Sequence, residues 1–287
     1  KVILVFGKPR TQAISPLFIN NLTSDVAIEI IGENQNDGLG CSVSSGDFNN
    51  DGFSDILVGE QSRDNNGKIY VIFGHNGTWQ TSIYSSYIGK SVPGAKIIGN
   101  VGSQSGNSVS NAGDVNKDGI EDFIIGAPLG NAVGRAEAGS AFVVFGRKEW
   151  SPEVYLFNPS FGGITIDGAN PKSHLGCSVS GAVDLNHDGN DDVIVGSFND
   201  DSYRGRVVVI FGSPKLLSGT VMDTANSSFF DGNERGFTLA GEGTGDQLGF
   251  SASSLGDVNQ DGIQDFIIGA NNRKIQEQRA GRSYVLF

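Results

Sequence analysis

The chain has 287 residues, of which 18% are charged and 42 are glycine. This length suffices for a large core, and the glycine content is typical of a β protein with many tight turns. The formal net charge of −12 argues against a nucleic-acid or anionic-membrane partner. No apolar run approaches the roughly 18 residues of a membrane-spanning helix, so we expect no membrane insertion within this segment.

Two predicted strands open the chain, at 1–7 (KVILVFG) and 26–32 (VAIEIIG), both rich in β-branched residues. The first full period follows, with strands predicted at 40–45, 55–59, 68–74 and 95–99. The third strand of the period recurs at 140–146, 206–212 and 282–287, and the fourth recurs at 163–168 and 236–241. Four short strands that lie close in sequence are typical of one blade of an all-β propeller.

A nine-residue acidic loop follows the first strand of each period. In the first copy, Asp47 to Asp55, oxygen-bearing side chains occupy positions 1, 3, 5 and 9, and Gly52 at position 6 allows a sharp turn. A hard cation such as Ca²⁺ takes about six to eight oxygen ligands, and a short loop supplies most of them only if alternate side chains converge. The copies start at residues 47, 114, 184 and 257, and such a repeat is typical of a propeller or a solenoid.

We therefore predict four Ca²⁺ sites, each with four side-chain ligands and the main-chain carbonyl of position 7. The predicted ligands are Asp47, Asn49, Asp51, Phe53 and Asp55; Asp114, Asn116, Asp118, Ile120 and Asp122; Asp184, Asn186, Asp188, Asn190 and Asp192; and Asp257, Asn259, Asp261, Ile263 and Asp265. Four Ca²⁺ ions would add +8 to the formal charge of −12 and leave −4.

Two other structures are compatible with such loops. An EF-hand loop needs Glu at position 12 and a following helix, whereas position 12 here is Val or Ile within a strand-like run. An Asx-rich turn without metal is the other alternative, because Asp, Asn and Gly are common turn residues. Three converging carboxylates repel one another without a cation, so the fourfold recurrence favours metal binding.

The periods divide the chain into blades. We predict a partial blade at 1–38, blades at 39–99, 100–168 and 169–241, and a partial blade at 242–287. The chain begins and ends at a third strand, so a ring closed through its termini would hold one third strand too many. We expect a processed segment of a larger propeller, and no closed four-bladed ring.

The Phe-Gly pairs at 73–74, 145–146 and 211–212, with Gly126-Ala127-Pro128 after a second strand, resemble FG-GAP repeats. Such repeats build the β-propeller of integrin α subunits and occur in many bacterial and protist surface proteins. The resemblance covers nearly the whole chain, although Gly-Ala-Pro is complete only in the second copy. It implies a propeller of about seven blades with calcium loops on one face and ligand contacts mainly on the opposite face.

The connections between second and third strands would form that opposite face. Its candidate partner-binding residues are Arg63, Arg135, Arg204, Arg206, Arg273 and Arg279, and ordinary solubilising charge is the alternative. Trp79 and Trp150 follow third strands, where we expect them to cover the outer edge of a blade rather than form a sugar platform.

The cysteines and the N-glycosylation sequons give little information about the cellular location of the protein. Cys41 and Cys177 occupy equivalent positions in non-adjacent repeats, so we expect two buried free thiols and no disulfide. Sequons at Asn21, Asn76 and Asn226 are candidate glycosylation sites and favour secretion weakly.

The leading hypothesis is a non-catalytic, calcium-binding module at the cell surface or outside the cell, with protein or glycan ligands. The three histidines lie in loops with no paired spacing, and no nucleophile elbow is present. A scaffold subunit of an extracellular appendage or matrix, contacting neighbouring subunits, is a second hypothesis. An accessory propeller of a secreted hydrolase such as a phospholipase is a third, by analogy of fold.

Overall fold

The computed structural model describes residues 1–7, 23, 26–62, 66–226, 230, 234–272, 274–275 and 278–287. Nearly all of the regular structure is β, which confirms the predicted all-β class. The helical exceptions in these ranges are short, a 3-10 turn at Ser85–Tyr87 and a single turn, α1, at Asp200–Tyr203. No helix in the described ranges is long and apolar enough to cross a bilayer.

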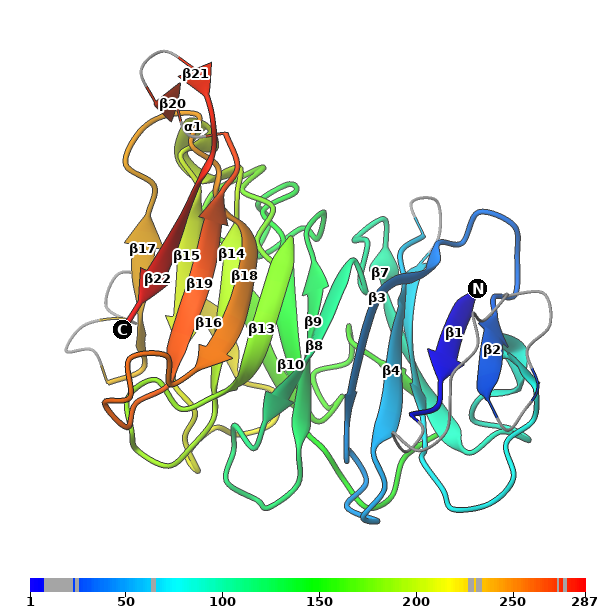
Figure 1. Cartoon of the computed structure of the whole chain (residues 1–287). Helices are drawn as coiled ribbons and strands as arrows, with labels where there is room; N and C mark the ends of the chain where they lie inside the picture. The colour runs from blue at the N-terminus through cyan, green and yellow to red at the C-terminus, as the bar shows by residue number, and fades with distance from the viewer. Residues whose placement is uncertain are drawn as a thin grey trace.

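Five sheets stand side by side in an open arc, with the N-terminal strands at one end and the last strand at the other (Figure 1). The first sheet holds β1 (Val2–Val5) and β2 (Ala27–Ile31). The second holds β3 (Leu39–Gly46), β4 (Asp55–Glu60), β5 (Asn66–Ile72) and β7 (Gly94–Val101). The third holds β8 (Ser108–Gly113), β9 (Asp122–Ala127), β10 (Ser140–Val144) and β12 (Gly163–Asp167).

The fourth sheet holds β13 (Ser178–Val183), β14 (Asp192–Ser197), β15 (Arg206–Ile210) and β17 (Gly236–Ala240). The fifth holds β18 (Leu248–Gly256), β19 (Asp265–Ala270) and β22 (Arg282–Leu286), and a separate ribbon pairs β20 (Lys274–Ile275) with β21 (Gln278–Arg279). The strands named so far pair antiparallel within their sheets, as predicted for propeller blades. The arc agrees with a β-propeller segment and not with a closed four-bladed ring.

Three sheets carry an extra strand that the sequence did not predict. These strands are β6 (Ser82–Tyr84), β11 (Glu153–Tyr155) and β16 (Val221–Asp223). Each follows the third strand of one repeat and pairs parallel with the fourth strand of the preceding sheet, namely β2, β7 or β12. Main chain therefore covers these outer edges, where we had expected tryptophan side chains to do so.

Trp150 packs inward instead. Its ring lies 5.9 Å from Phe123 and 6.4 Å from Phe73, and its Nε1–H donates to the carbonyl of Phe48 at 3.2 Å. Trp79 stacks on His75 at 4.2 Å and packs against the core between the first two sheets. Both tryptophans thus seal the junctions between sheets rather than their outer edges.

The core lies between neighbouring sheets. One cluster joins the second and third sheets, with Leu57 and Ile97 against Phe123 and Ile125, all 0% exposed. The second strands β9 and β14 are buried along their whole length. Their runs FIIGA and VIVGS are apolar without alternation because both faces of a central strand lie between sheets.

The first strands line the inner side of the arc, where β3 contacts β8, β8 contacts β13 and β13 contacts β18. In three of these strands, a serine donates a hydrogen bond to the main chain of the next repeat. Ser42 Oγ donates to the carbonyl of Gly106 at 2.8 Å, and Ser108 and Ser178 donate in the same way to Gly176 and Gly249, both at 2.9 Å. The serines of the Gly-x-Ser triplets at 40–42, 106–108 and 176–178 therefore link neighbouring sheets by hydrogen bonds.

Candidate metal centres and the opposite face

The four acidic loops join the first and second strands of four sheets and lie on the lower side of the arc in Figure 1. In the first loop, the Asp47 carboxylate accepts the N–H groups of Asp51 at 3.1 Å and Gly52 at 2.9 Å. Asp51 Oδ1 accepts the N–H of Phe53 at 2.9 Å. The same bonds recur in the other three loops within 0.1 Å, so the repeated sequence folds into one repeated turn.

The turn needs left-handed backbone at two exposed positions, 4 and 6. Position 6 is always glycine, with φ between 82° and 91°, a region open to glycine at no steric cost. Position 4 is also left-handed and carries Asn50, Lys117, His187 or Gln260. His187 is exposed.

The aspartate at position 9 is buried in every copy: Asp55, Asp122, Asp192 and Asp265 are each 0% exposed. In the first copy, its Oδ2 accepts the N–H of Phe48 at 3.0 Å and its Oδ1 accepts the N–H of Gly74 at 2.9 Å. The second and third copies repeat both bonds. This carboxylate therefore fastens the loop to the end of the third strand.

The glycine of each Phe-Gly pair is the residue that donates this second bond. A Cβ at Gly74 would overlap with the carbonyl oxygen of Ser54, and a Cβ at Gly146 would overlap with that of Glu121. In the fourth copy, Phe287 is the last residue of the sequence and Asp265 Oδ1 has no partner among the described residues. Our sequence reasoning used Phe-Gly as a family mark and missed this function, although the fixed spacing from loop to Phe-Gly was a usable signal.

Burial raises the pKa of Asp55 to about 6, of Asp192 to about 7 and of Asp122 to about 8. Two main-chain N–H bonds oppose the rise in each case, and the carboxylates at positions 5 and 1 add to it. No loop carboxylate pairs with a Lys or Arg among the described salt bridges. The aspartates of one loop thus lie near enough to repel one another.

Within the described ranges, no three His, Cys, Asp or Glu side chains are gathered as a ready metal cluster. The carboxylates at positions 1 and 5 accept the loop's own N–H groups instead. The donors available in each loop are three carboxylates, one Asn amide oxygen and the carbonyl of position 7, a set that contains only oxygen. That chemistry fits a hard cation such as Ca²⁺, and the fit holds for all four predicted ligand sets.

Neighbouring loops touch through position 8, which the sequence analysis did not single out. Glu121 Oε2 in the second loop accepts the N–H of Asp47 in the first loop at 2.9 Å. Asp191 Oδ2 in the third loop accepts the N–H of Asp114 in the second at 2.8 Å. Position 8 of the fourth loop is Gln264, which is exposed. An acidic residue at position 8 therefore joins the first three loops in series.

The arginines that we assigned to the opposite face do not form a free basic surface. Arg135 donates to both carboxylate oxygens of Asp223, at 3.1 and 2.6 Å, and to the carbonyl of Gly168 at 2.9 Å. Arg206 pairs with the buried Asp200 at 2.7 Å. These side chains link the second-to-third-strand connections to nearby segments of the chain.

The remaining assignments on this face divide into two groups. Arg204 pairs with Asp201 at 3.2 Å. Arg63 and Arg273 lie outside the described residues, and so does the side chain of Arg279. The predicted basic patch thus rests on three described arginines, each already paired with an acidic side chain.

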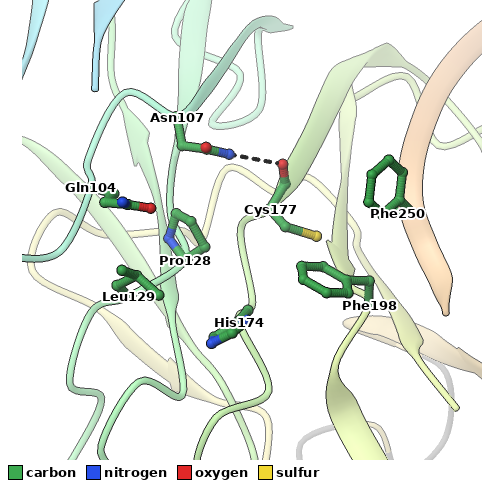
Figure 2. Close-up of a pocket in the computed structure, with 8 residues that line it drawn as sticks. All are labelled: Gln104, Asn107, Pro128, Leu129, His174, Cys177, Phe198 and Phe250. Carbon is green, nitrogen blue, oxygen red and sulfur yellow. Dashed lines mark hydrogen bonds between the residues drawn. The ribbon is translucent and has the colours of Figure 1, made fainter. Parts of the chain in front are cut away.

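A pocket of about 550 Å³ does open on this face, at the junction of the third, fourth and fifth sheets (Figure 2). It is lined by Gln104, Asn107, Pro128, Leu129, His174, Cys177, Phe198 and Phe250. The Phe198 ring lies 5.7 Å from that of Phe250 and 5.6 Å from that of His174. The pocket is therefore an aromatic hollow with amide groups at its side.

Burial lowers the pKa of His174 more than the nearby Glu137 raises it, and Nε2 lies 3.8 Å from the Glu137 carboxylate, beyond hydrogen-bond distance. Burial raises the pKa of the Cys177 thiol to about 11, and the thiol donates to the carbonyl of Gly249 at 3.3 Å. Both cysteines are free, as predicted, but Cys41 is exposed, so the expectation of two buried thiols was wrong.

Two of the candidate glycosylation sites, Asn76 and Asn226, have exposed side chains. Asn21 lies outside the described residues. Exposure is a requirement for modification and does not establish it.

The sequence is similar to proteins of known families. The FG-GAP repeat model matches residues 40–72, 105–144 and 249–286. The chain is 28% identical to integrin alpha-6 of Gallus gallus over 192 residues, which is 62% of this chain and 15% of that protein. It is 25% identical to integrin alpha-7 of Mus musculus over 249 residues, 79% of this chain and 18% of that one.

The chain is also 28% identical to a phosphatidylinositol-glycan-specific phospholipase D of Dictyostelium discoideum over 222 residues. That match covers 71% of this chain and 23% of the phospholipase. The chain therefore spans less than a quarter of the length of these relatives. The chain carries FG-GAP repeats in three places and is similar in sequence to integrin α chains, and its antiparallel sheets are those of a β-propeller segment.

Proposed function

We propose that this chain is a non-catalytic, calcium-stabilised propeller segment that serves as an interaction module at a cell surface or in an extracellular assembly. The observation that carries the proposal is the fourfold repetition of one loop geometry around a buried aspartate, with only oxygen donors. Similarity to integrin α chains supports the adhesive role and the location. Protein or glycan ligands, or neighbouring subunits, are the partners we propose.

The ligands in each loop have distinct roles. Asp47, Asn49 and Asp51 would hold the ion from the loop itself, with the carbonyl of Phe53, while Asp55 would hold it from the start of the second strand. A bound Ca²⁺ would supply two positive charges against the three carboxylates. Because Asp55 also accepts the N–H of Gly74, an ordered loop steadies the end of the third strand as well.

Thermal unfolding with and without chelator tests the calcium proposal. We expect millimolar Ca²⁺, the range of extracellular modules, to raise the melting temperature above that in EDTA, and Mg²⁺ to substitute poorly. Asp118→Ala should reduce the number of bound Ca²⁺ ions by one, whereas Glu149→Ala, at an exposed position outside the loops, should not. Equal melting curves in Ca²⁺ and EDTA would contradict structural calcium.

The adhesive role has its own test. The immobilised chain should retain extracellular proteins or glycans from a defined panel in Ca²⁺, and Phe198→Asp in the pocket of Figure 2 should reduce retention without changing the melting temperature by much. Retention that is unchanged by substitutions across the opposite face would argue against that face as the binding surface.

The phospholipase relative favours a second candidate function, an accessory propeller beside a catalytic region. This reading predicts that the chain binds a phosphatidylinositol-glycan or a neighbouring catalytic domain. Binding of glycan-anchored vesicles by the chain, with no retention of matrix proteins, would favour it over the adhesive role.

A further inference from the structure

The first ligand position of two acidic loops is held by a side chain of the neighbouring loop. The N–H of Asp47 donates to Glu121 Oε2 at 2.9 Å, and the N–H of Asp114 donates to Asp191 Oδ2 at 2.8 Å. Hydrogen bonds to an ionised carboxylate are stronger than those between neutral groups. Each carboxylate therefore fixes the main chain of a predicted ligand that belongs to the preceding loop.

The two position 8 carboxylates are themselves oriented by other contacts. Glu121 Oε2 also accepts Asn111 Nδ2 at 3.0 Å, and the N–H of Asn111 donates to Ser44 Oγ at 2.9 Å. The N–H of Asp191 donates to the carbonyl of Asp114 at 3.4 Å, so these two residues are joined by a pair of bonds. Both carboxylates are half-buried and are held against the preceding loop.

A glycine immediately before each of these first ligands makes room for the carboxylate. A Cβ at Gly46 would lie 2.6 Å from Glu121 Oε2, and a Cβ at Gly113 would overlap with Asp191 Oδ2. A side chain at either position would displace the carboxylate from the N–H that it accepts. The sequence thus combines a glycine before position 1 with an acidic residue at position 8 of the following loop.

The third loop has neither of these two features. Val183 precedes its first ligand, Asp184, and packs in the core between the fourth and fifth sheets at 0% exposure. Position 8 of the following loop is Gln264, which is exposed and carries no charge. The third loop therefore has the same four side-chain ligand types as the first two, without a carboxylate from its neighbour.

We propose that Glu121 and Asp191 are positioning residues for Ca²⁺, and that they raise the affinity of the first and second loops although each belongs to the following loop. This inference rests on the calcium binding proposed above. Neither carboxylate pairs with a Lys or Arg among the described salt bridges. Each therefore brings a fourth negative charge to a loop that already has three, and the number of charges tunes the affinity of Ca²⁺ loops.

A titration with Ca²⁺ that follows each loop separately tests the inference. Gly52, Gly119 and Gly189 donate their N–H groups to the position 1 carboxylates of the first, second and third loops. Their amide resonances in the chain labelled with ¹⁵N-glycine should therefore report the filling of each loop. Glu121→Gln keeps the size and the acceptor but removes the charge. It should raise the Ca²⁺ midpoint of Gly52 by about ten- to hundredfold, the usual effect of residues that orient a metal ligand.

The other two glycines serve as internal controls for Glu121→Gln. The midpoint of Gly119 should change less than that of Gly52, and the midpoint of Gly189 should not change. Asp191→Asn repeats the test one loop further along, where Gly119 should show the largest change, and it keeps the inference testable if Glu121→Gln does not fold. Gln264→Ala is the matched control at the same loop position and should leave all three midpoints unchanged.

The outcomes separate this inference from the calcium proposal on which it rests. An unchanged midpoint of Gly52 in folded Glu121→Gln, or a larger change at Gly119 than at Gly52, would overturn the inference and leave calcium binding intact. Equal changes at all three glycines would also overturn it, because they would show a general loss of stability. If no glycine responds to Ca²⁺ in the wild type, the calcium proposal fails and this inference fails with it.

Discussion

The main-chain N–H of Asp47 donates to the carboxylate of Glu121 at 2.9 Å, which joins the first acidic loop to the second. The same carboxylate accepts Asn111 Nδ2 at 3.0 Å. Glu121 is a position 8 residue, outside the predicted ligand set, yet it holds the residue that begins the neighbouring loop. A hydrogen bond thus connects the first candidate metal loop directly to the second.

Removal of this link should destabilise the protein. Glu121→Ala leaves two donors without their charged acceptor, and we expect the free energy of unfolding to fall by about 1–3 kcal/mol in urea titrations with Ca²⁺ present. Gln264→Ala changes the same loop position where the side chain is exposed and should cost less than about 0.5 kcal/mol. Equal effects of the two substitutions would show that the loop-to-loop bond carries no stability.

Substitution of the glycine in a Phe-Gly pair should destabilise the protein only where the main chain of an acidic loop packs against that glycine. A Cβ at Gly146 would overlap with the carbonyl of Glu121, so Gly146→Ala should destabilise the chain by about 1–3 kcal/mol through backbone displacement. Gly7 belongs to the same motif, and a Cβ there meets nothing within 4 Å. Gly7→Ala is therefore the matched control. Calorimetry of both variants decides the point, and a stable Gly146→Ala would refute the steric argument.

The ion pair between Arg135 and Asp223 should contribute to the free energy of unfolding in a way that depends on pH. Burial alone would raise the pKa of Asp223, but the hydrogen bonds from Arg135 outweigh it and hold the pKa below its ordinary value of 3.8. A carboxylate with a depressed folded-state pKa contributes stability above its unfolded pKa and loses it as the pH falls through the folded pKa. The pair should therefore contribute fully at pH 5 to 7 and little near pH 2.

Arg135→Met tests this pair. We expect a loss of about 1 kcal/mol near neutral pH, since both side chains are partly exposed, and a smaller difference from the wild type near pH 2. A double-mutant cycle with Asp223→Asn isolates the pair from the bond of Arg135 to Gly168. A pH-independent difference would mean that packing, and not charge, explains the effect of the substitution.

The two thiols should differ in reactivity. Burial raises the pKa of both, to about 11 for Cys177, and only Cys41 is exposed. Since the thiolate is the reactive form, iodoacetamide at pH 8 should modify Cys41 well before Cys177. Mass spectrometry of the wild type and of Cys41→Ser follows each site. Fast labelling of the Cys41→Ser variant would show that the pocket around Cys177 opens in solution.

Most of the repeating structure was predictable from the sequence for a local reason. Each acidic loop is nine residues long, and its turn depends on Gly52 and its counterparts and on bonds between residues two to five apart. The β-branched runs beside the loops, such as that at β9, are equally local signals. The positions of the main strands and the repeated turn of each loop therefore followed from the amino-acid order.

Contacts between distant residues were beyond such reasoning. The three-residue strands β6, β11 and β16 are too short to give a period-two signal, and their partners lie more than 50 residues away in the chain. The pairing of Arg135 with Asp223 spans 88 residues, so a basic patch expected from composition became an internal link.

The order of residues by itself determined the antiparallel strands of the five sheets, the four acidic turns and the class of fold, because each depends on backbone preferences and side-chain chemistry within a few neighbouring positions. Only the tertiary structure decided which sheet edges are covered, which arginines are paired and which junctions hold a pocket. Those outcomes depend on how whole repeats pack, and in particular on the register that places one repeat's extended segment beside another repeat's edge.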